Sequence, residues 1–239
     1  AFNKCTGLIP GPIHINVPLR EPLYGKTVYP DKAARKIEIL TGNSSLSEEH
    51  IDLLKSEISR YERVLLLTGA QHHNSELKLA LDAMAEKGVV VLTETLSNLE
   101  SEAFIANMDR VVSTIGEDEQ LFFAPDILIT LDVPVLSKMV KKIIRQRKPH
   151  IHWHFSNDSQ ITDTYHALTR IIKGDAAQIL NQVAEQMPRR DKRFNDTWTK
   201  RSEQSSARHN QYFEKLEWCD LQMFRLLSKQ ALPQMQIQL

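Results

Sequence analysis

Three histidines at alternating positions have the spacing in this chain that most directly suggests chemistry. His150, His152 and His154 stand at positions i, i+2 and i+4. On a β-strand their side chains would share one face, about 7 Å apart. Alternate histidines are a spacing that metal ligands use, but a closed site needs a fourth ligand, and residues 150–155 contain no Asp, Glu or Cys. Packing of the intervening apolar residues explains the strand without a metal, so we favour packing over metal binding.

A second candidate site consists of residues that follow two predicted strands. Gly69 and Gln71 come after an apolar run, and Ser137 and Lys138 come after another. Open α/β sheets bind their ligands at the carboxyl ends of strands. Ser137 can cap a helix, whereas Lys138 in its first turn would oppose the helix dipole unless an anion lies nearby. The four residues are a candidate anion or effector pocket; the alternative is a polar capping loop and a solvated lysine.

Glu94 keeps a nucleotide-binding alternative open. It follows the predicted strand at 89–92, where dinucleotide-binding domains carry an acidic residue that binds ribose. The chain has no GxGxxG motif to support that interpretation. A free-standing Rossmann-like nucleotide-binding module and a structural interaction domain therefore stand as alternatives to the function developed below.

The elements that would position these residues alternate between strand and helix. Apolar runs at 64–67, 89–92, 126–131 and 151–155 predict strands, and those without alternation suit a sheet buried on both faces. Amphipathic stretches predict helices from Ser47, over 74–87, over 137–147 and over 175–187, with a further helical stretch that includes Phe104, Ile105 and Met108. This order predicts an α/β fold with a doubly wound, mainly parallel sheet. Beyond Asp191 the composition predicts a C-terminal helical extension of one or two helices.

Composition excludes several classes of function. The 239 residues contain 30 Lys and Arg against 30 Asp and Glu, which argues against a general nucleic-acid binder. No apolar run approaches the ~20 residues of a membrane span. Cys5 and Cys219 lie at opposite ends of the chain, and a reduced, cytoplasmic protein is the simplest interpretation.

The proline-rich stretch Gly11-Pro12-Ile13-His14-Ile15-Asn16-Val17-Pro18-Leu19-Arg20-Glu21-Pro22-Leu23-Tyr24 carries a resemblance to a known family. It is similar to the "GPVHINVPFREPL" signature of thiamine-diphosphate-dependent enzymes. Its "REPLY" end resembles most closely the menaquinone-pathway branch, the 2-succinyl-5-enolpyruvyl-6-hydroxy-3-cyclohexene-1-carboxylate (SEPHCHC) synthases. Val135-Leu136-Ser137-Lys138 also resembles the "PVSK" turn of that family's central domain, without the glycine that usually precedes it.

The resemblance implies a division of the chain into three parts. Residues 1–32 would end the pyrimidine-binding domain and form a linker, 33–187 would form the Rossmann-like central domain, and 188–239 would be a helical connector into the diphosphate-binding domain. The parent enzyme would be a homo-oligomer that decarboxylates 2-oxoglutarate on thiamine diphosphate and adds the succinyl unit to isochorismate. Thiamine diphosphate and Mg²⁺ would be held by the two flanking domains, because the 239 residues contain no GDG motif. We therefore expect this stretch to be a scaffold, inactive alone and without catalytic, cofactor-binding or metal-binding residues.

Overall fold

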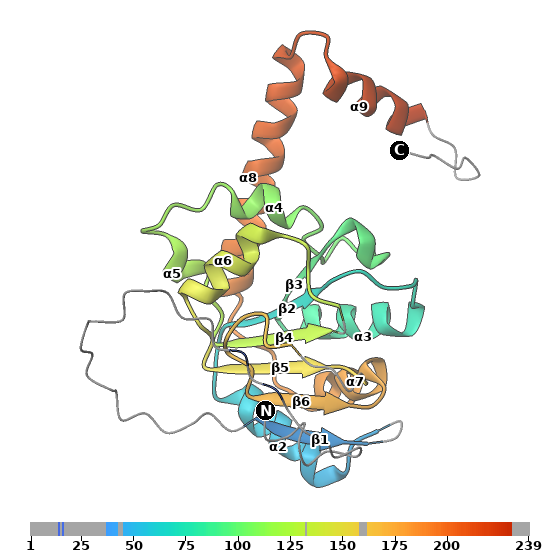
Figure 1. Cartoon of the computed structure of the whole chain (residues 1–239), viewed down its shortest axis with the longest axis vertical. Coiled ribbons are helices and arrows are strands. Elements are labelled where there is room, and N and C mark those ends of the chain that lie inside the picture. The colour runs from blue at the N-terminus through green and yellow to red at the C-terminus, as the bar shows by residue number, and fades with distance from the viewer. Residues whose placement is uncertain are drawn as a thin grey trace.

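The chain forms a parallel β-sheet flanked by helices (Figure 1). The structure is a computed structural model and describes residues 14, 16, 37–42, 45–131, 133–157 and 162–230. The predicted 1–32 segment, apart from His14 and Asn16, therefore lies outside the described residues, and so does most of the proline-rich signature. The six strands are β1 (Glu38–Thr41), β2 (Val64–Thr68), β3 (Val90–Thr93), β4 (Ile127–Leu131), β5 (Ile151–Phe155) and β6 (Arg170–Lys173). They pair in parallel in the order β1-β6-β5-β4-β2-β3, which confirms the predicted doubly wound sheet.

Burial on both faces explains why the central strands are continuous apolar runs. Every residue of β2 and β4 is buried, including Leu66, which is 0% exposed. Alternate residues of β2, β3 and β4 enter two separate clusters, one on each face of the sheet. A parallel sheet needs helices over both faces to exclude water from these side chains.

Three helices cover one face of the sheet, and each begins at a side-chain cap. Ser47, Asn74 and Asp175 accept hydrogen bonds from backbone N–H groups in the first helical turns, which otherwise lack partners. After the second of these helices, Gly88 has a φ of 92°, a conformation that favours glycine, and the helix ends close to the predicted boundary at 87. The helices are α2 (Glu48–Ser59), α3 (Ser75–Glu86) and α7 (Ala176–Gln186).

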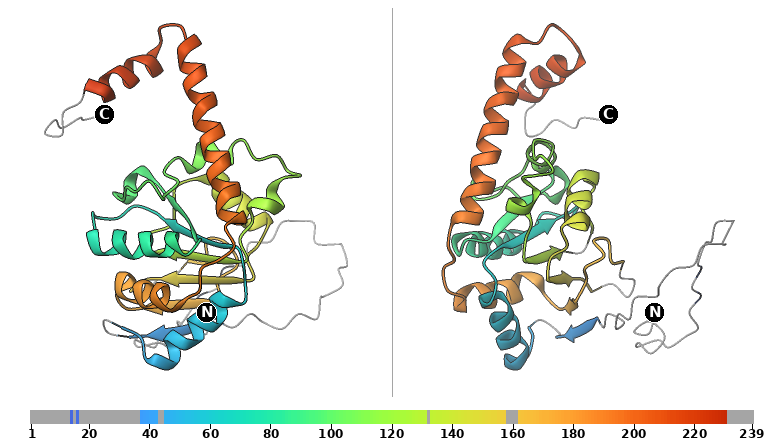
Figure 2. Two further views of the ribbon diagram at one scale, coloured as in Figure 1. Left: turned by 180° about the vertical axis from the view of Figure 1, so that it is seen from behind. Right: turned by 90° about the vertical axis from the view of Figure 1, so that its left-hand side faces the viewer.

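The opposite face is covered by α4 (Met108–Val112), α5 (Gln120–Phe123), α6 (Lys138–Gln146) and the first half of α8 (Arg193–Lys215) (Figure 2). One prediction here was wrong. Phe104 and Ile105 are not helical, because the backbone of Ile105 extends the sheet edge: its N–H donates to Val91 (2.9 Å) and its carbonyl accepts from Thr93 (3.1 Å). The helix therefore begins only at Met108.

Arginine side chains fix the helical extension to the α/β part. Arg201 of α8 donates to the Glu119 carboxylate (2.5 Å) and to the carbonyl of Thr114 (2.7 Å), and it lies over the Phe123 ring. Beyond this contact α8 projects away from the sheet and is followed by α9 (Asp220–Gln230) (Figures 1 and 2). The prediction of one or two helices after Asp191 is confirmed, with two in the described residues.

A salt bridge joins the starts of two central strands. The Arg63 guanidinium and backbone N–H donate to both carboxylate oxygens of Asp126, at 2.6–3.1 Å. Burial opposes ionisation of Asp126, but these hydrogen bonds and the positive charge of Arg63 hold its pKa below its usual value. Asp126 is therefore charged at neutral pH and links the segments that lead into β2 and β4.

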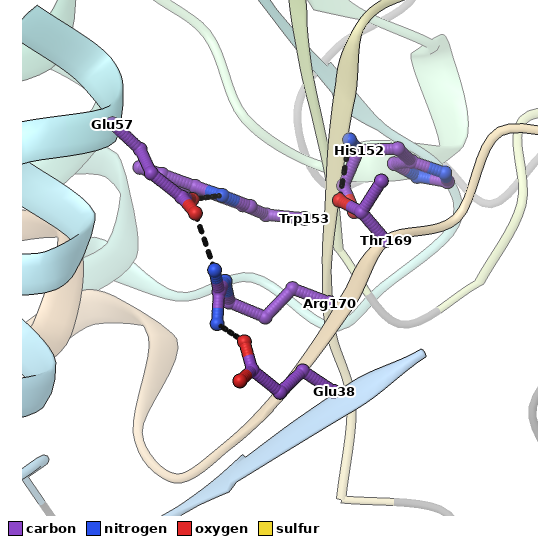
Figure 3. A network of polar contacts seen from close by, with 6 residues as sticks. All are labelled: Glu38, Glu57, His152, Trp153, Thr169 and Arg170. Atoms are coloured by element: carbon purple, nitrogen blue, oxygen red, sulfur yellow. Dashed lines mark hydrogen bonds and ion pairs between the residues drawn. The ribbon is translucent and has the colours of Figure 1, made fainter. Parts of the chain in front are cut away.

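A second polar network is buried between the edge strand and α2 (Figure 3). Arg170 of β6 is 6% exposed, and its guanidinium donates to Glu57 of α2 and to Glu38 of β1. The other carboxylate oxygen of Glu57 accepts from the indole N–H of Trp153 at 2.8 Å. The network thus ties four elements together on the face covered by α2.

Candidate site at the carboxyl ends of the strands

The carboxyl ends of β2 and β4 meet where the strand order reverses. β2 connects to β3 on one side, and the chain then crosses to β4 on the other side of β2. At such a reversal, the loops diverge and leave a crevice in which α/β proteins bind ligands. Here the loops approach closely: a Cβ atom on Gly69 would overlap the carbonyl oxygen of Val133. Glycine is thus required at position 69 by the close approach of the loop after β4.

Hydrogen bonds join the loops after β2 and β3. The backbone N–H of Gln71 donates to the carbonyl of Leu96 (3.0 Å), and the Asn98 side chain donates to the carbonyl of Gln71 (2.7 Å). Asn98 has a φ of 52°, a left-handed conformation that asparagine tolerates better than most residues. The Gln71 side-chain nitrogen is buried and has no hydrogen-bond partner among the described residues.

The N-terminus of α6 already receives carboxylates from the chain itself. The Ser137 hydroxyl accepts from the N–H of Val140 (3.1 Å), which confirms the predicted cap, and donates to Asp109 (2.5 Å). The Ser137 backbone N–H donates to Glu94 Oε1 (3.0 Å). A negative charge is favourable there because the helix dipole is positive at this end. Sequence reasoning placed Glu94 after the right strand but did not predict this contact.

The structure arranges the four predicted pocket residues on two adjacent loops. Gly69 and Gln71 share the loop after β2, and Gly69 contacts the segment after β4 that leads to Ser137 and Lys138. Lys138 is exposed, whereas Ser137 is buried. Any external anion at Ser137 would meet the Glu94 carboxylate, so binding by this set stays a prediction that depends on the exposed charge of Lys138.

A hollow lies beside this helix start, with a volume of about 460 Å³. It is bounded by the loop after β3, the start of α4, Leu136 before α6, and His209 of α8. Its polar side chains include the carboxylates Glu94 and Asp109 and the basic residues Arg110 and His209. The mixture of charges suits the binding and orientation of a ligand.

The three histidines do not form one cluster. His150 precedes β5, and its ring stacks on Tyr61 with 5.6 Å between ring centroids. His152 and His154 lie on the same face of β5, where the Thr130 hydroxyl is 2.8 Å from a ring nitrogen of each. The expectation of a shared face is therefore wrong for His150. Among the described residues, no group of three or more His, Cys, Asp or Glu side chains could hold a metal ion.

Comparisons with known proteins identify SEPHCHC synthases among the relatives of this chain. The SEPHCHC synthase of Porphyromonas gingivalis is 28% identical over 226 residues, which are 91% of this chain and 39% of that protein. The synthase of Flavobacterium psychrophilum is 34% identical over 161 residues, 67% of this chain and 29% of that protein. The chain thus spans well under half the length of these relatives. No protein-family model matches the sequence.

Among solved structures, a putative thiamin diphosphate-dependent enzyme from Mycobacterium smegmatis is 15% identical with a TM-score of 0.34. The match covers 67% of this chain and 31% of that one, a likeness too weak to support an argument about function. In the described residues, no helix is both long and apolar enough to span a membrane. The sequence relatives, however, confirm the resemblance noted in the signature: this chain is homologous to one part of the SEPHCHC synthases.

Proposed function

We propose that this chain is the central scaffold of a SEPHCHC synthase, and that it positions the catalytic domains without supplying catalytic residues. One observation carries the proposal: the match to the P. gingivalis synthase covers 91% of this chain but only 39% of the relative. The parent would decarboxylate 2-oxoglutarate and transfer the succinyl unit to isochorismate. Residues 33–187 would be the central domain, 188–239 the connector, and 1–32 the end of the preceding domain.

Thiamine diphosphate, with Mg²⁺, would supply the electron sink for decarboxylation when bound by the flanking domains of the parent. The present chain would contribute rigid spacing between those domains. Catalytic groups must be held in productive geometry by their supports, because small displacements cost much of the rate. A rigid central domain is therefore a catalytic requirement even when it touches no substrate.

The connector has the contacts that such a spacer needs. Between α7 and α8, the Arg190 guanidinium donates to the carbonyls of Ile58 and Tyr61 at the end of α2. The Arg190 N–H donates to the carbonyl of Lys87 (3.0 Å), and the Lys87 ammonium donates to the carbonyl of Met187 (3.1 Å). These contacts fix the direction in which α8 leaves the α/β part.

The far end of the connector offers an apolar surface for a partner domain. No residue of α9 is buried. Four of its large apolar residues are each about half exposed, namely Leu221, Phe224, Leu226 and Leu227. Trp218, before α9, is 70% exposed. Exposed apolar patches of this kind mark interaction surfaces. We expect the diphosphate-binding domain of the parent to cover them.

The proposal is tested by replacing the matched region of the P. gingivalis synthase with this chain. The chimera would contain both flanking domains of the relative, and we expect it to bind thiamine diphosphate with Mg²⁺ and to consume 2-oxoglutarate. The matched control is the same chimera with Leu66→Ala, which weakens the α/β core. Its loss of activity should parallel its loss of thermal stability.

Two results would contradict the scaffold role. One is a folded chimera that does not bind thiamine diphosphate, since this chain would then fail to align the flanking domains. The other is saturable, micromolar binding of thiamine diphosphate by the 239-residue chain alone, measured by calorimetry. The second result would place a cofactor site within this chain.

A further inference from the structure

The hollow beside the start of α6 is lined by carboxylates that contact α6 and by basic groups that lie on α8 or contact it. Glu94 and Asp109 contribute carboxylates from the loop after β3 and from α4. Arg110 of α4 and His209 of α8 contribute basic groups. Glu94 Oε2 and Arg110 Nε are both buried and lack a hydrogen-bond partner among the described residues. Another atom of each side chain is already hydrogen-bonded, but a buried polar atom without a partner is costly, so two such atoms beside one hollow favour a polar ligand there.

The basic side of the hollow suits an anion. One terminal nitrogen of Arg110 donates a hydrogen bond to the Ser206 hydroxyl (3.0 Å), so the guanidinium lies toward α8. His209 stands next along α8, with Phe213 packed edge-on against its ring. Partial burial, together with the nearby positive charges of Arg110 and Arg225, lowers the pKa of His209. An anion placed between these groups would relieve the repulsion.

The acidic side suits a donor of hydrogen bonds. Glu94 Oε1 accepts a hydrogen bond from the Ser137 N–H, and Asp109 Oδ1 accepts one from the Ser137 hydroxyl. The α6 cap therefore sets the positions of both carboxylates. Glu94 Oε2 has no hydrogen-bond partner among the described residues, but it is buried, so a ligand hydroxyl reaches it only after the side chain rotates. Carboxylates accept from sugar hydroxyls, and an acidic residue after the second strand of an α/β unit commonly has this role. An anionic group could not lie on this side without repulsion.

We propose that the hollow binds a phosphorylated sugar, with its phosphate on Arg110 and His209 and its hydroxyls on Glu94 and Asp109. A tetrahedral phosphate can accept from donors on two different helices, here α4 and α8. The volume of about 460 Å³ is within the range of small-molecule sites. Leu96 and Leu136 at the rim could pack against a base if the sugar phosphate is part of a nucleotide. The site is independent of the proposed scaffold role.

The test is calorimetric titration of the 239-residue chain with ribose 5-phosphate, AMP, ribose, inorganic phosphate and gluconate. Ribose 5-phosphate should bind at least about tenfold more tightly than ribose or phosphate alone, because it engages both sides of the hollow. AMP that binds at least as tightly would identify a nucleotide as the source. Ribose 5-phosphate without AMP binding would identify a free sugar phosphate. Gluconate has hydroxyls with a carboxylate in place of the phosphate, and equal binding of it would overturn the phosphate assignment.

Variants separate the site from nonspecific charge. Arg110→Met and His209→Asn should each weaken ribose 5-phosphate binding by about tenfold or more, as loss of a charged hydrogen bond does. Glu94→Gln should weaken ribose 5-phosphate but leave inorganic phosphate unchanged. Arg208→Met is the matched control, because Arg208 is exposed on α8 next to His209 and does not line the hollow. Circular dichroism melting checks that each variant is folded. If Arg110→Met is not folded, His209→Asn alone tests the phosphate contact.

A direct readout follows the ring of His209 by NMR. Bound phosphate should raise the pKa of His209, because an anion stabilises the imidazolium against the charges of Arg110 and Arg225. The shift should disappear in Arg110→Met. The proposal fails if no ligand gives saturable binding up to millimolar concentration, or if Arg208→Met weakens binding as much as Arg110→Met.

Discussion

Removing the cation of the buried Arg170 network should destabilise the α/β part by several kcal/mol. The Arg170 side chain is 8% exposed and the Glu57 side chain 16%, so both charges lie largely out of water. Arg170→Met would leave the Glu57 carboxylate buried with the Trp153 indole as its one remaining side-chain donor among the described residues. Breaking a buried ion pair from one side costs about 3–5 kcal/mol. Glu38 is the matched control, because its side chain is 59% exposed, and Glu38→Gln should cost less than about 1 kcal/mol.

The double variant Arg170→Met/Glu57→Met separates the cost of a stranded charge from the value of the pair. Replacing both charges by apolar groups removes the stranded carboxylate and is often nearly neutral. The Trp153 N–H then loses its acceptor, which costs about 1–3 kcal/mol. We therefore expect the double variant to be more stable than Arg170→Met alone. Urea unfolding followed by circular dichroism and tryptophan fluorescence gives these differences, provided that the m-value is unchanged.

Two outcomes would refute this account. If Arg170→Met and Glu38→Gln cost the same, the burial of the Glu57 contact would not govern the energy. The free energy of unfolding lost by the double variant is compared with the losses in Arg170→Met and Glu57→Met. If it equals their sum, the two charges are not coupled.

Further predictions concern the core, the acid range and the predicted pocket. Leu66→Ala should lower the free energy of unfolding by about 2–5 kcal/mol, whereas Leu79→Ala, at a position 66% exposed on α3, should change it little; equal midpoints in urea would contradict the packing. The pKa of Asp126 is lower in the folded state than its ordinary value of 3.8, so its stabilisation is complete above that pH and is lost as the pH falls through the folded pKa. Asp126→Asn should therefore flatten the loss of stability in urea titrations between about pH 5 and pH 2, and an unchanged pH slope would exclude this role. Small carboxylates should shift the amide signal of Ser137 in NMR, and Lys138→Ala should abolish the shift; shifts that persist would reject the pocket.

The sequence alone predicted elements whose signal is local. The run 64–67 is apolar without interruption, and so short a run between turns favours a strand buried on both faces. Ser47 and Ser137 could be predicted at helix starts because a capping serine accepts from a backbone N–H only three residues further along the chain. The stretch around Ile105 was mistaken for a helix because its backbone pairs with Val91 and Thr93, and no local pattern records that pairing.

The interactions at the candidate site depend on residues far apart in the chain. Glu94 meets Ser137 across 43 positions, and Arg110 meets Ser206 across 96. The sequence alone does not identify Ser137 as the partner of Glu94 or Ser206 as the partner of Arg110. Without the strand order, each loop could lie next to any of several others. Gly69 shows the same limit: its sequence context indicates a turn, whereas the reason for glycine is the carbonyl of Val133 on another loop.

The contacts of α8 and α9 show how firmly each of these two helices is held by the rest of the chain. Near the sheet, Arg201 of α8 is held by Glu119 and the Thr114 carbonyl. At the other end, Arg225 of α9 lies over the Phe213 ring of α8 at 4.2 Å, but α9 buries none of its own residues. Segments with few buried contacts open at lower free energy than a core does. The base of α8 is therefore anchored by the α/β part, whereas α9 would gain a comparable anchor only from whatever covers its apolar residues.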